Sequence, residues 1–287
     1  MSKNEGEGKE CFEEVVDEIG VGNDTNPEEH APWWQVLIVA AACGGVSALC
    51  YSNAFDADFV FDDTGAIVEN PDVVGQGTLW EKMVDMTAHD YWGNDMRISS
   101  HKSYRPLTIL SFRLNWMQAG GKLNTEIFHG TNVCLHVAVT FMLIIIIRLY
   151  RILPSSSEGV GAGKGDTESG GEREIWGLGV MGVLFAAHPI HCEAVTGLVG
   201  RADVLAALLV LMALLVYHPA VACKGGVVAA VVCIASMAGA AALIVCATLC
   251  KETGYIPLTY LLTYPLTYPL TSGSPSHTKE RISLSSS

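Results

Sequence analysis

Two adjacent carboxylates, Asp62 and Asp63, are the residues of this chain best suited to proton-transfer chemistry. They lie in the stretch FVFDDTGAIVENPDV, which follows an apolar segment running from Trp33 to Tyr51. A carboxylate at a membrane surface can act as a general base toward a substrate hydroxyl. Away from a membrane the same pair would be an ordinary solvated loop, so the surrounding elements decide between the two interpretations.

A second group of polar residues lies in HPIHCEAVTGLVGRADVLA, at the boundary of another apolar segment. Ionisable side chains at a membrane boundary are costly and usually functional. Arg201 offers a planar fork of donors that suits a phosphate group, and histidines can add donors near neutral pH. Alternatively, Arg201 pairs with Asp203 or Glu193 and only fixes helix packing. The candidate phosphate-binding or substrate-binding residues here are His188, His191, Glu193, Arg201 and Asp203.

Three further candidates lie elsewhere in the chain. Lys251 and Glu252 follow the last apolar segment in the sequence LCKETG, and Arg105 precedes a proline that suits the start of a helix. They present the same choice between substrate binding and structural ion pairing.

A zinc site formed by His188, His191 and Cys192 is conceivable, but it lacks a second pair of ligands at the usual spacing. The Gly-rich run GAGKGD lacks the spacing of a phosphate-binding loop. We therefore predict no metal site and no cofactor, although a requirement for a divalent metal is not decided by the sequence.

The elements that position these residues are long apolar segments. Hydrophobic residues make up 50% of the chain and charged residues only 16%, a balance typical of membrane proteins. A helix needs about 20 residues to cross a hydrocarbon core of about 30 Å, so the shorter third and fourth segments should be tilted or extended by flanking residues. The predicted spans are residues 33–51, 127–150, 175–190, 202–217 and 226–250. The sequence thus predicts an all-α polytopic membrane domain over residues 33–254.

Polar segments flank and interrupt this domain. Residues 1–32 carry much of the net charge of −13 and are predicted to be a disordered acidic tail. Residues 153–174 are rich in Gly, Ser and charge, which is typical of a flexible connector. Residues 255–287 form a low-complexity Tyr/Pro and then Ser-rich tail, whose prolines would break a spanning helix. No basic patch is present that would bind nucleic acid.

The orientation follows from counting spans from a cytosolic N-terminus. Residues 52–126 then form a lumenal loop and residues 153–174 a cytosolic linker, as the positive-inside rule favours. All candidate residues come to lie on the lumenal face. Glycosylation of Asn23 would contradict this topology, because its sequon Asn23-Asp24-Thr25 is modified only in the lumen.

Short helices are expected within the lumenal loop. Thr78 and Glu81 form a capping box ahead of an apolar helical face, which predicts a helix in the membrane interface. A second helix is predicted after Arg105, with an apolar stripe formed by Leu107, Leu110, Leu114 and Met117.

Five stretches carry a resemblance to a known family. FVFDDTGAIVENPDV, HDYWGNDM, HKSYRPLTILSFRLNW, HPIHCEAVTGLVGRADVLA and LCKETG occur in this order, and together they resemble the membrane portion of the transmembrane and tetratricopeptide-repeat-containing proteins, glycosyltransferases of the GT-C class. The resemblance implies a multi-pass enzyme of the endoplasmic reticulum membrane. Such an enzyme moves mannose from dolichyl-phosphate mannose to Ser or Thr of secretory-pathway proteins, cadherins among them.

The resemblance also implies a mechanism. An acidic residue of the first lumenal loop is the catalytic base in this class, and it maps onto Asp62 or Asp63. This residue would accept the proton of the acceptor hydroxyl as its oxygen attacks the anomeric carbon with inversion. The charge on the departing dolichyl phosphate would be stabilised by basic side chains. The candidates for that role are His188, His191, Arg201 and Lys251.

The chain departs from the family after Gly254. Complete members continue into further spans and repeats of about 34 residues, so we expect a truncated product, and the sequence leaves open whether it is active. Two other functions remain as alternatives. One is a non-catalytic interaction protein of the endoplasmic reticulum membrane, and the less favoured one is a small transporter, for which no inverted repeat is visible.

Overall fold

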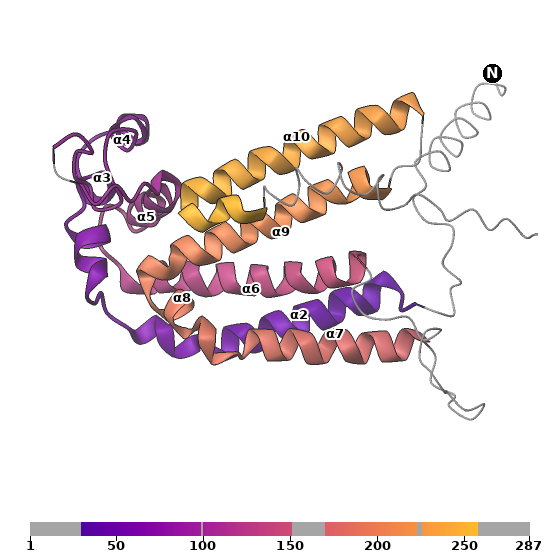
Figure 1. The fold of residues 1–287 in the computed structure, drawn as a ribbon. Helices are drawn as coiled ribbons and strands as arrows, with labels where there is room; N and C mark the ends of the chain where they lie inside the picture. The colour runs from indigo at the N-terminus through magenta and orange to yellow at the C-terminus, as the bar shows by residue number, and fades with distance from the viewer. Residues whose placement is uncertain (1–29, 99, 151–169, 223–225, 258–287) are drawn as a thin grey trace, which may run out of the picture.

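The computed structural model describes residues 30–98, 100–150, 170–222 and 226–257. Five long helices lie side by side, and the shorter elements gather at one end of this bundle, on the left in Figure 1. The described residues contain no β-strand, only an isolated bridge between His89 and Asp95. The all-α prediction is therefore confirmed. The long helices are α2 (Trp33–Cys50), α6 (Thr125–Leu149), α7 (Gly170–Ala186), α9 (Arg201–Ala222) and α10 (Val227–Cys250).

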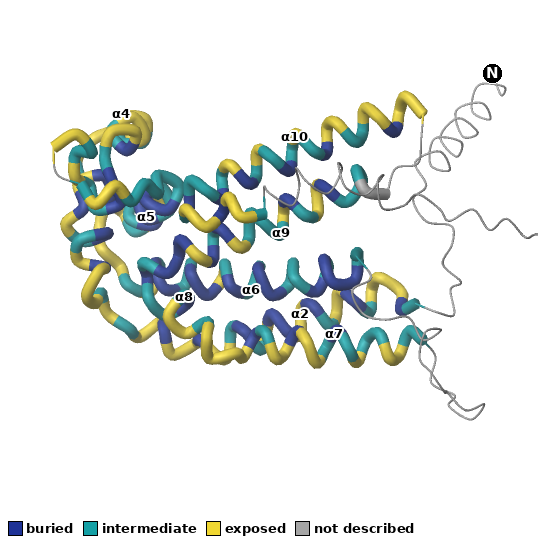
Figure 2. Tube along the Cα trace, viewed as in Figure 1, coloured by how far each residue is buried: buried dark blue, intermediate teal, exposed yellow. Residues whose placement is uncertain are grey.

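Four of these helices are long and apolar enough to cross a membrane. The exception, α7, passes the same test only together with the residues Pro189–Thr196, from which it is bent by 42°, so the described part of the chain holds four or five candidate spans. Exposed residues recur along the long helices (Figure 2). Many of them are large and apolar, for example Val231 and Ile234 on α10. Because such a surface is stable in lipid, the chain is a multi-pass membrane protein.

The helices α2, α6 and α7 pack closely through small residues. Cys43 of α2, Ile144 of α6 and Leu178 of α7 belong to one buried cluster. Gly182 of α7 lies directly against it, since a Cβ atom there would stand 2.6 Å from Cys43 Sγ and 2.7 Å from Ile144 Cδ1. Helices in membranes associate mainly by such close van der Waals packing.

Replacing Gly182 by Ala should therefore destabilise the bundle by about 1–3 kcal/mol, because the added methyl group overpacks the contact. Thermal unfolding of the purified protein in detergent measures this effect. Gly45 of α2 is the matched control: no atom lies within 4 Å of its would-be Cβ. Gly45→Ala should be neutral or slightly stabilising, since Ala favours a helix over Gly by about 1 kcal/mol. Equal melting temperatures for the two variants would contradict the packing described.

An ion pair joins α2, α6 and α7 at the end of the bundle that is remote from the short elements. Arg148 Nε lies 3.0 Å from Glu174 Oε1, and the other oxygen of Glu174 accepts the Ala31 backbone N–H at 2.8 Å. The Arg148 guanidinium also lies over the ring of Trp33. The helices α2, α6 and α7 are thus tied together at this end.

The segment between α2 and α6 folds into a small packed unit. Its apolar core joins residues from the segment itself, such as Ile67, Tyr91 and Phe112, to Phe128 of α6 and Leu198. The predicted capping box is confirmed, because Thr78 and Glu81 exchange backbone-to-side-chain hydrogen bonds at 2.7 and 3.3 Å. The unit's elements are η1 (Ser52–Asp56), η2 (Thr64–Val68), α3 (Pro71–Val74), α4 (Leu79–Asp85) and α5 (Pro106–Gln118).

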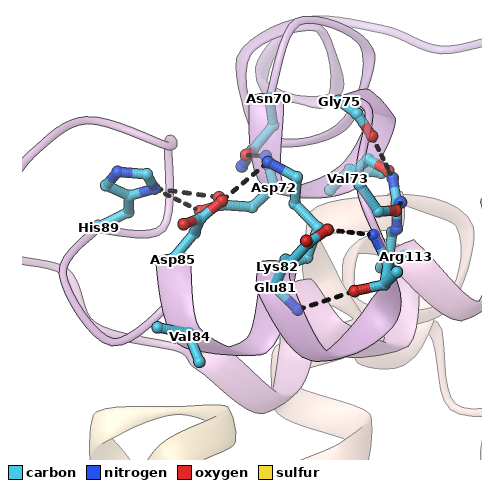
Figure 3. A network of polar contacts seen from close by, with 12 residues as sticks. Asn70, Asp72, Val73, Gly75, Glu81, Lys82, Val84, Asp85, His89 and Arg113 are labelled. Carbon is cyan, nitrogen blue, oxygen red and sulfur yellow. Dashed lines mark hydrogen bonds and ion pairs between the residues drawn. The ribbon is translucent and has the colours of Figure 1, made fainter.

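Buried polar side chains hold this unit together (Figure 3). Asn70 donates to the carbonyls of Ala66 and Tyr91, both at 3.1 Å. Arg113 of α5 donates to the carbonyls of Val73 and Gly75 at 2.7 Å and to that of Gly77 at 2.8 Å. Buried carbonyls without such donors would each be costly.

The carboxylate of Asp72 completes the unit. It is almost fully buried and lies 3.0 Å from Nδ1 of His89 (Figure 3). Burial raises the pKa of Asp72, and the contact with His89 opposes that rise. This pair links α3 to the loop that leads toward Tyr91.

Three short elements connect α7 to α9, and a fourth follows α10. These are η4 (Pro189–His191), α8 (Cys192–Thr196), η5 (Leu198–Gly200) and η6 (Glu252–Tyr255). The predicted tails at 1–32 and 255–287, the linker at 153–174 and the sequon at Asn23 lie largely or wholly outside the described residues. The orientation across the membrane stays a prediction.

Candidate functional site

A pocket of about 530 Å³ opens at the end of the bundle where the short elements lie. This volume is in the range of small-molecule sites. Its walls come from four parts of the chain: the turn before η2, the loop before α5, the segment from η4 to α9, and the residue that follows α10. The lining residues are Asp62, Tyr91, Trp92, Arg105, Ile190, Glu193, Ala194, Gly197, Val199, Gly200, Asp203 and Lys251.

The pocket thus brings together five of the ten residues predicted to form a site. Asp62, Arg105, Glu193, Asp203 and Lys251 all line it, although they are spread over most of the sequence. They meet because the loops that carry them all join helix ends on the same side of the bundle.

The acid pair directly follows a sharp turn. Phe61 adopts a φ of 46°, in the left-handed region that costs energy for a bulky side chain, and its own ring is 93% exposed. Asp62 follows at the surface of the pocket, whereas Asp63 is only 2% exposed. The two carboxylates therefore have different environments and cannot play the same role.

Asp63 acts as an anchor. Its carboxylate accepts the backbone N–H of Val60 at 3.0 Å and that of Val199, on η5, at 3.3 Å. Burial raises the pKa of Asp63, while these two hydrogen bonds and the nearby His129 lower it and the charge of Asp62 raises it. By joining its own turn to η5, Asp63 fixes Asp62 relative to the opposite wall of the pocket.

The two basic residues of the pocket are both paired with acids. Arg105 Nη2 lies 3.0 Å from Glu252 Oε2, and Arg105 Nε donates to both oxygens of the same carboxylate. Lys251 forms an ion pair with Asp203. Glu252 is also one of the predicted site residues. Partial desolvation raises its pKa, but the hydrogen bonds from Arg105 and Ser103 lower it, and the net shift of the pKa is downward. The Arg105–Glu252 bond also ties the loop before α5 to the end of α10.

Arg201 lies behind the pocket rather than in its wall. Its side chain is fully buried, and its guanidinium donates to Asn132 Oδ1, Asn115 Oδ1 and the carbonyl of Phe128 at 2.6–2.7 Å. The guanidinium also stacks over the ring of Phe112 at 4.5 Å. In this arrangement Arg201 joins the start of α9 to α5 and α6, and it does not line the pocket.

The histidines of the predicted cluster also lie outside the pocket lining. His188 Nδ1 accepts the backbone N–H of Ile190 at 3.2 Å and so caps η4. The ring of His191 packs against Phe185 and His136, with centroid distances of 4.5 and 5.0 Å. Within the described ranges, no group of three His, Cys, Asp or Glu side chains comes together as a metal site would require.

Two aromatic residues of the pocket received no role from the sequence. Tyr91 and Trp92 belong to the stretch HDYWGNDM, where the preceding Asp90 accepts the backbone N–H groups of Trp92 and Asn94 at 2.9 Å. This loop structure places both residues in the wall of the pocket. The sequence feature that could have pointed to these two residues is an acid followed by two aromatic residues in a polar loop.

Fold and site together define an all-α, multi-pass membrane protein with one charged pocket at the bundle end described above. Comparison with known proteins identifies its relatives. The chain is 38% identical to protein O-mannosyl-transferase TMTC4 of Mus musculus over 195 residues, which are 67% of this chain and 24% of the relative. It is 38% identical to TMTC1 of Mus musculus over 254 residues, 85% of this chain and 23% of the relative.

A relative from another species gives the same result. Protein O-mannosyl-transferase Tmtc2 of Drosophila melanogaster is 39% identical over 176 residues, 61% of this chain and 16% of the relative. Over most of its described length the chain is thus similar to proteins named O-mannosyl-transferases, and it spans about a quarter of the length of the first of these relatives. No family model and no solved structure matches it.

Proposed function

We propose that this chain carries the donor-binding and base-bearing part of a protein O-mannosyltransferase. It would transfer mannose from dolichyl-phosphate mannose to Ser or Thr of secretory-pathway proteins, cadherins among them. The observation that supports the proposal is the pocket itself, whose lining includes both the acid Asp62 and the cations Arg105 and Lys251. Similarity to proteins named O-mannosyl-transferases supports this chemistry.

Each wall of the pocket has a role in this proposal. Asp62 is the base, because it faces the pocket while Asp63 is engaged in anchoring. It takes the proton of the acceptor hydroxyl as the oxygen attacks the anomeric carbon, and the bond from that carbon to the phosphate oxygen breaks. Arg105 and Lys251 then stabilise the negative charge on the dolichyl phosphate that leaves.

The membrane location follows from the same proposal. The pocket end faces the lumen of the endoplasmic reticulum, and the N-terminus is cytosolic. A lipid-linked donor reaches such a pocket from the bilayer, since the helices that lead to it expose apolar side chains along their length.

Binding of the donor tests the proposal. Arg105→Gln and Lys251→Gln should each weaken binding of dolichyl-phosphate mannose to the purified chain in nanodiscs by about 10- to 100-fold, because each removes a charged hydrogen-bond donor. Lys122→Gln is the control, since Lys122 is exposed and does not line the pocket. The proposal is wrong if the wild-type chain binds no donor, or if all three variants bind it as the wild type does.

A further inference from the structure

Tyr91 combines a position in the wall of the pocket with a hydroxyl group that no described residue satisfies. Its side chain is 2% exposed, and its hydroxyl oxygen is buried without a hydrogen-bond partner. An unsatisfied buried hydroxyl costs about 1–3 kcal/mol, and most buried polar groups in native proteins are paired. The hydroxyl of Tyr91 therefore calls for an explanation.

Loose packing does not explain it, because the backbone around Tyr91 is fixed. The Tyr91 N–H donates to the carbonyl of Ser103 at 2.7 Å, and Asp90 receives two backbone N–H groups and the hydroxyl of Ser100. The ring belongs to the core of the loop unit and lies against Trp92 with a centroid distance of 5.2 Å. The loop thus holds the ring in one place.

Charged groups of the site surround this ring. The guanidinium of Arg105 lies 5.0 Å from its centroid. Burial is the largest effect on the pKa of Tyr91 and raises it. The charges of Arg105 and Arg201 lower this pKa, whereas those of Asp63 and Asp62 raise it. The net shift of the pKa is upward. The side chain therefore keeps its O–H at neutral pH, and it offers an uncharged donor beside the cations that face the pocket.

We propose that Tyr91 is a ligand-binding residue of this pocket, whose O–H donates to an oxygen of a phosphate-bearing ligand. The identity of that ligand as a dolichyl phosphate rests on the proposed function. The hydroxyl oxygen is closed off from solvent, so the ligand reaches it through a small movement of the ring or of the wall beside it. A free phosphate and a lipid phosphate both offer the phosphate oxygen that this O–H would bind.

The variant Tyr91→Phe tests this role, because it removes only the hydroxyl. We expect binding of dolichyl-phosphate mannose by the full chain in nanodiscs to weaken by about 10- to 100-fold, the effect of losing a hydrogen bond to a charged group. The melting temperature should stay the same or rise, since no bond within the protein is lost.

Tyr150→Phe is the matched control. The hydroxyl of Tyr150 donates to the carbonyl of Leu214 at 2.8 Å, at the opposite end of the bundle. This variant should melt at a lower temperature and bind the donor as the wild type does. Competition by inorganic phosphate, measured on both the wild type and Tyr91→Phe, separates recognition of the phosphate from recognition of the lipid.

Two results would overturn the proposal. One is unchanged binding of both the donor and inorganic phosphate in Tyr91→Phe. The other is a fall in its melting temperature as large as that of Tyr150→Phe, which would show that the hydroxyl has a structural partner. A wild-type chain that binds inorganic phosphate through Tyr91 but not the lipid donor would refute the proposed function while supporting the role of Tyr91.

Discussion

Replacing Asp62 by Asn should lower the rate of mannosyl transfer by about 10²- to 10⁴-fold, the usual contribution of a general base. The amide keeps the shape of the carboxylate but cannot accept the proton of the acceptor hydroxyl. The stability of the protein should not change, because Asp62 is exposed in the pocket. Rates measured with saturating donor, together with melting temperatures of both proteins, check this expectation.

Asp63→Ala is the informative comparison, because it should lower the stability of the protein first and its activity only as a consequence. Removal of the carboxylate leaves the N–H groups of Val60 and Val199 without their acceptor. These bonds are partly buried, and a fully buried N–H without a partner would cost about 1–3 kcal/mol. The melting temperature should fall, and activity should fall with it as the pocket wall moves. If Asp62→Asn stays active while Asp63→Asn, at unchanged stability, does not, the base is Asp63 and the assignment must be exchanged.

Arg201→Met should destabilise the protein by about 3 kcal/mol or more. The substitution leaves the side-chain oxygens Asn132 Oδ1 and Asn115 Oδ1 without the Arg201 donors, and each unsatisfied buried acceptor costs about 1–3 kcal/mol. Arg201→Lys should also be destabilising, because an ammonium group cannot reproduce the planar fork. Thermal unfolding in detergent, monitored as the loss of folded protein, measures the effect of both substitutions.

The control for this prediction is Arg105→Met. Arg105 forms a partly exposed ion pair with Glu252, and such pairs contribute only about 0–1 kcal/mol. It should therefore affect donor binding far more than stability. A stable Arg201→Met protein that has lost only donor binding would show that Arg201 contacts the phosphate, as the sequence analysis predicted, and that its burial is relieved when the ligand enters.

The sequence predicted the helices of the bundle well because hydropathy is a strong, local signal. The first predicted span, 33–51, coincides with α2 at Trp33–Cys50 to within one residue. The weakest prediction concerned α7, which begins at Gly170 rather than near residue 175. Its glycines lower the apparent helix propensity, and its packing against α2 and α6 makes up for that.

The packing of the loop unit could not be predicted from local patterns. The stripe predicted for α5 includes Leu114 and Met117, which are exposed, whereas Phe112 and the polar Arg113 are buried. Arg113 is buried because carbonyls from the α3 segment, some forty residues earlier in the chain, accept its hydrogen bonds. No periodicity within α5 carries that information.

The site shows the same division between local and distant information. Asp62 and Lys251 could be assigned to one face because they follow the ends of spanning helices, and span counting needs no tertiary contacts. Arg201 could not be placed in the same way, since the asparagines that enclose it come from α5 and α6. That the hydroxyl of Tyr91 has no hydrogen-bond partner is likewise visible only in the folded loop.

Transfer of mannose by the chain itself is the most direct test of the proposed function. The purified protein, reconstituted in liposomes with labelled dolichyl-phosphate mannose, is given a Ser/Thr-containing acceptor peptide, and label on the peptide is located by mass spectrometry. We expect labelled mannose on a Ser or Thr hydroxyl with the wild-type chain and a rate lower by orders of magnitude with Asp62→Asn. No transfer by the wild type, or equal transfer by both, would contradict the assignment of this pocket as the site of the reaction.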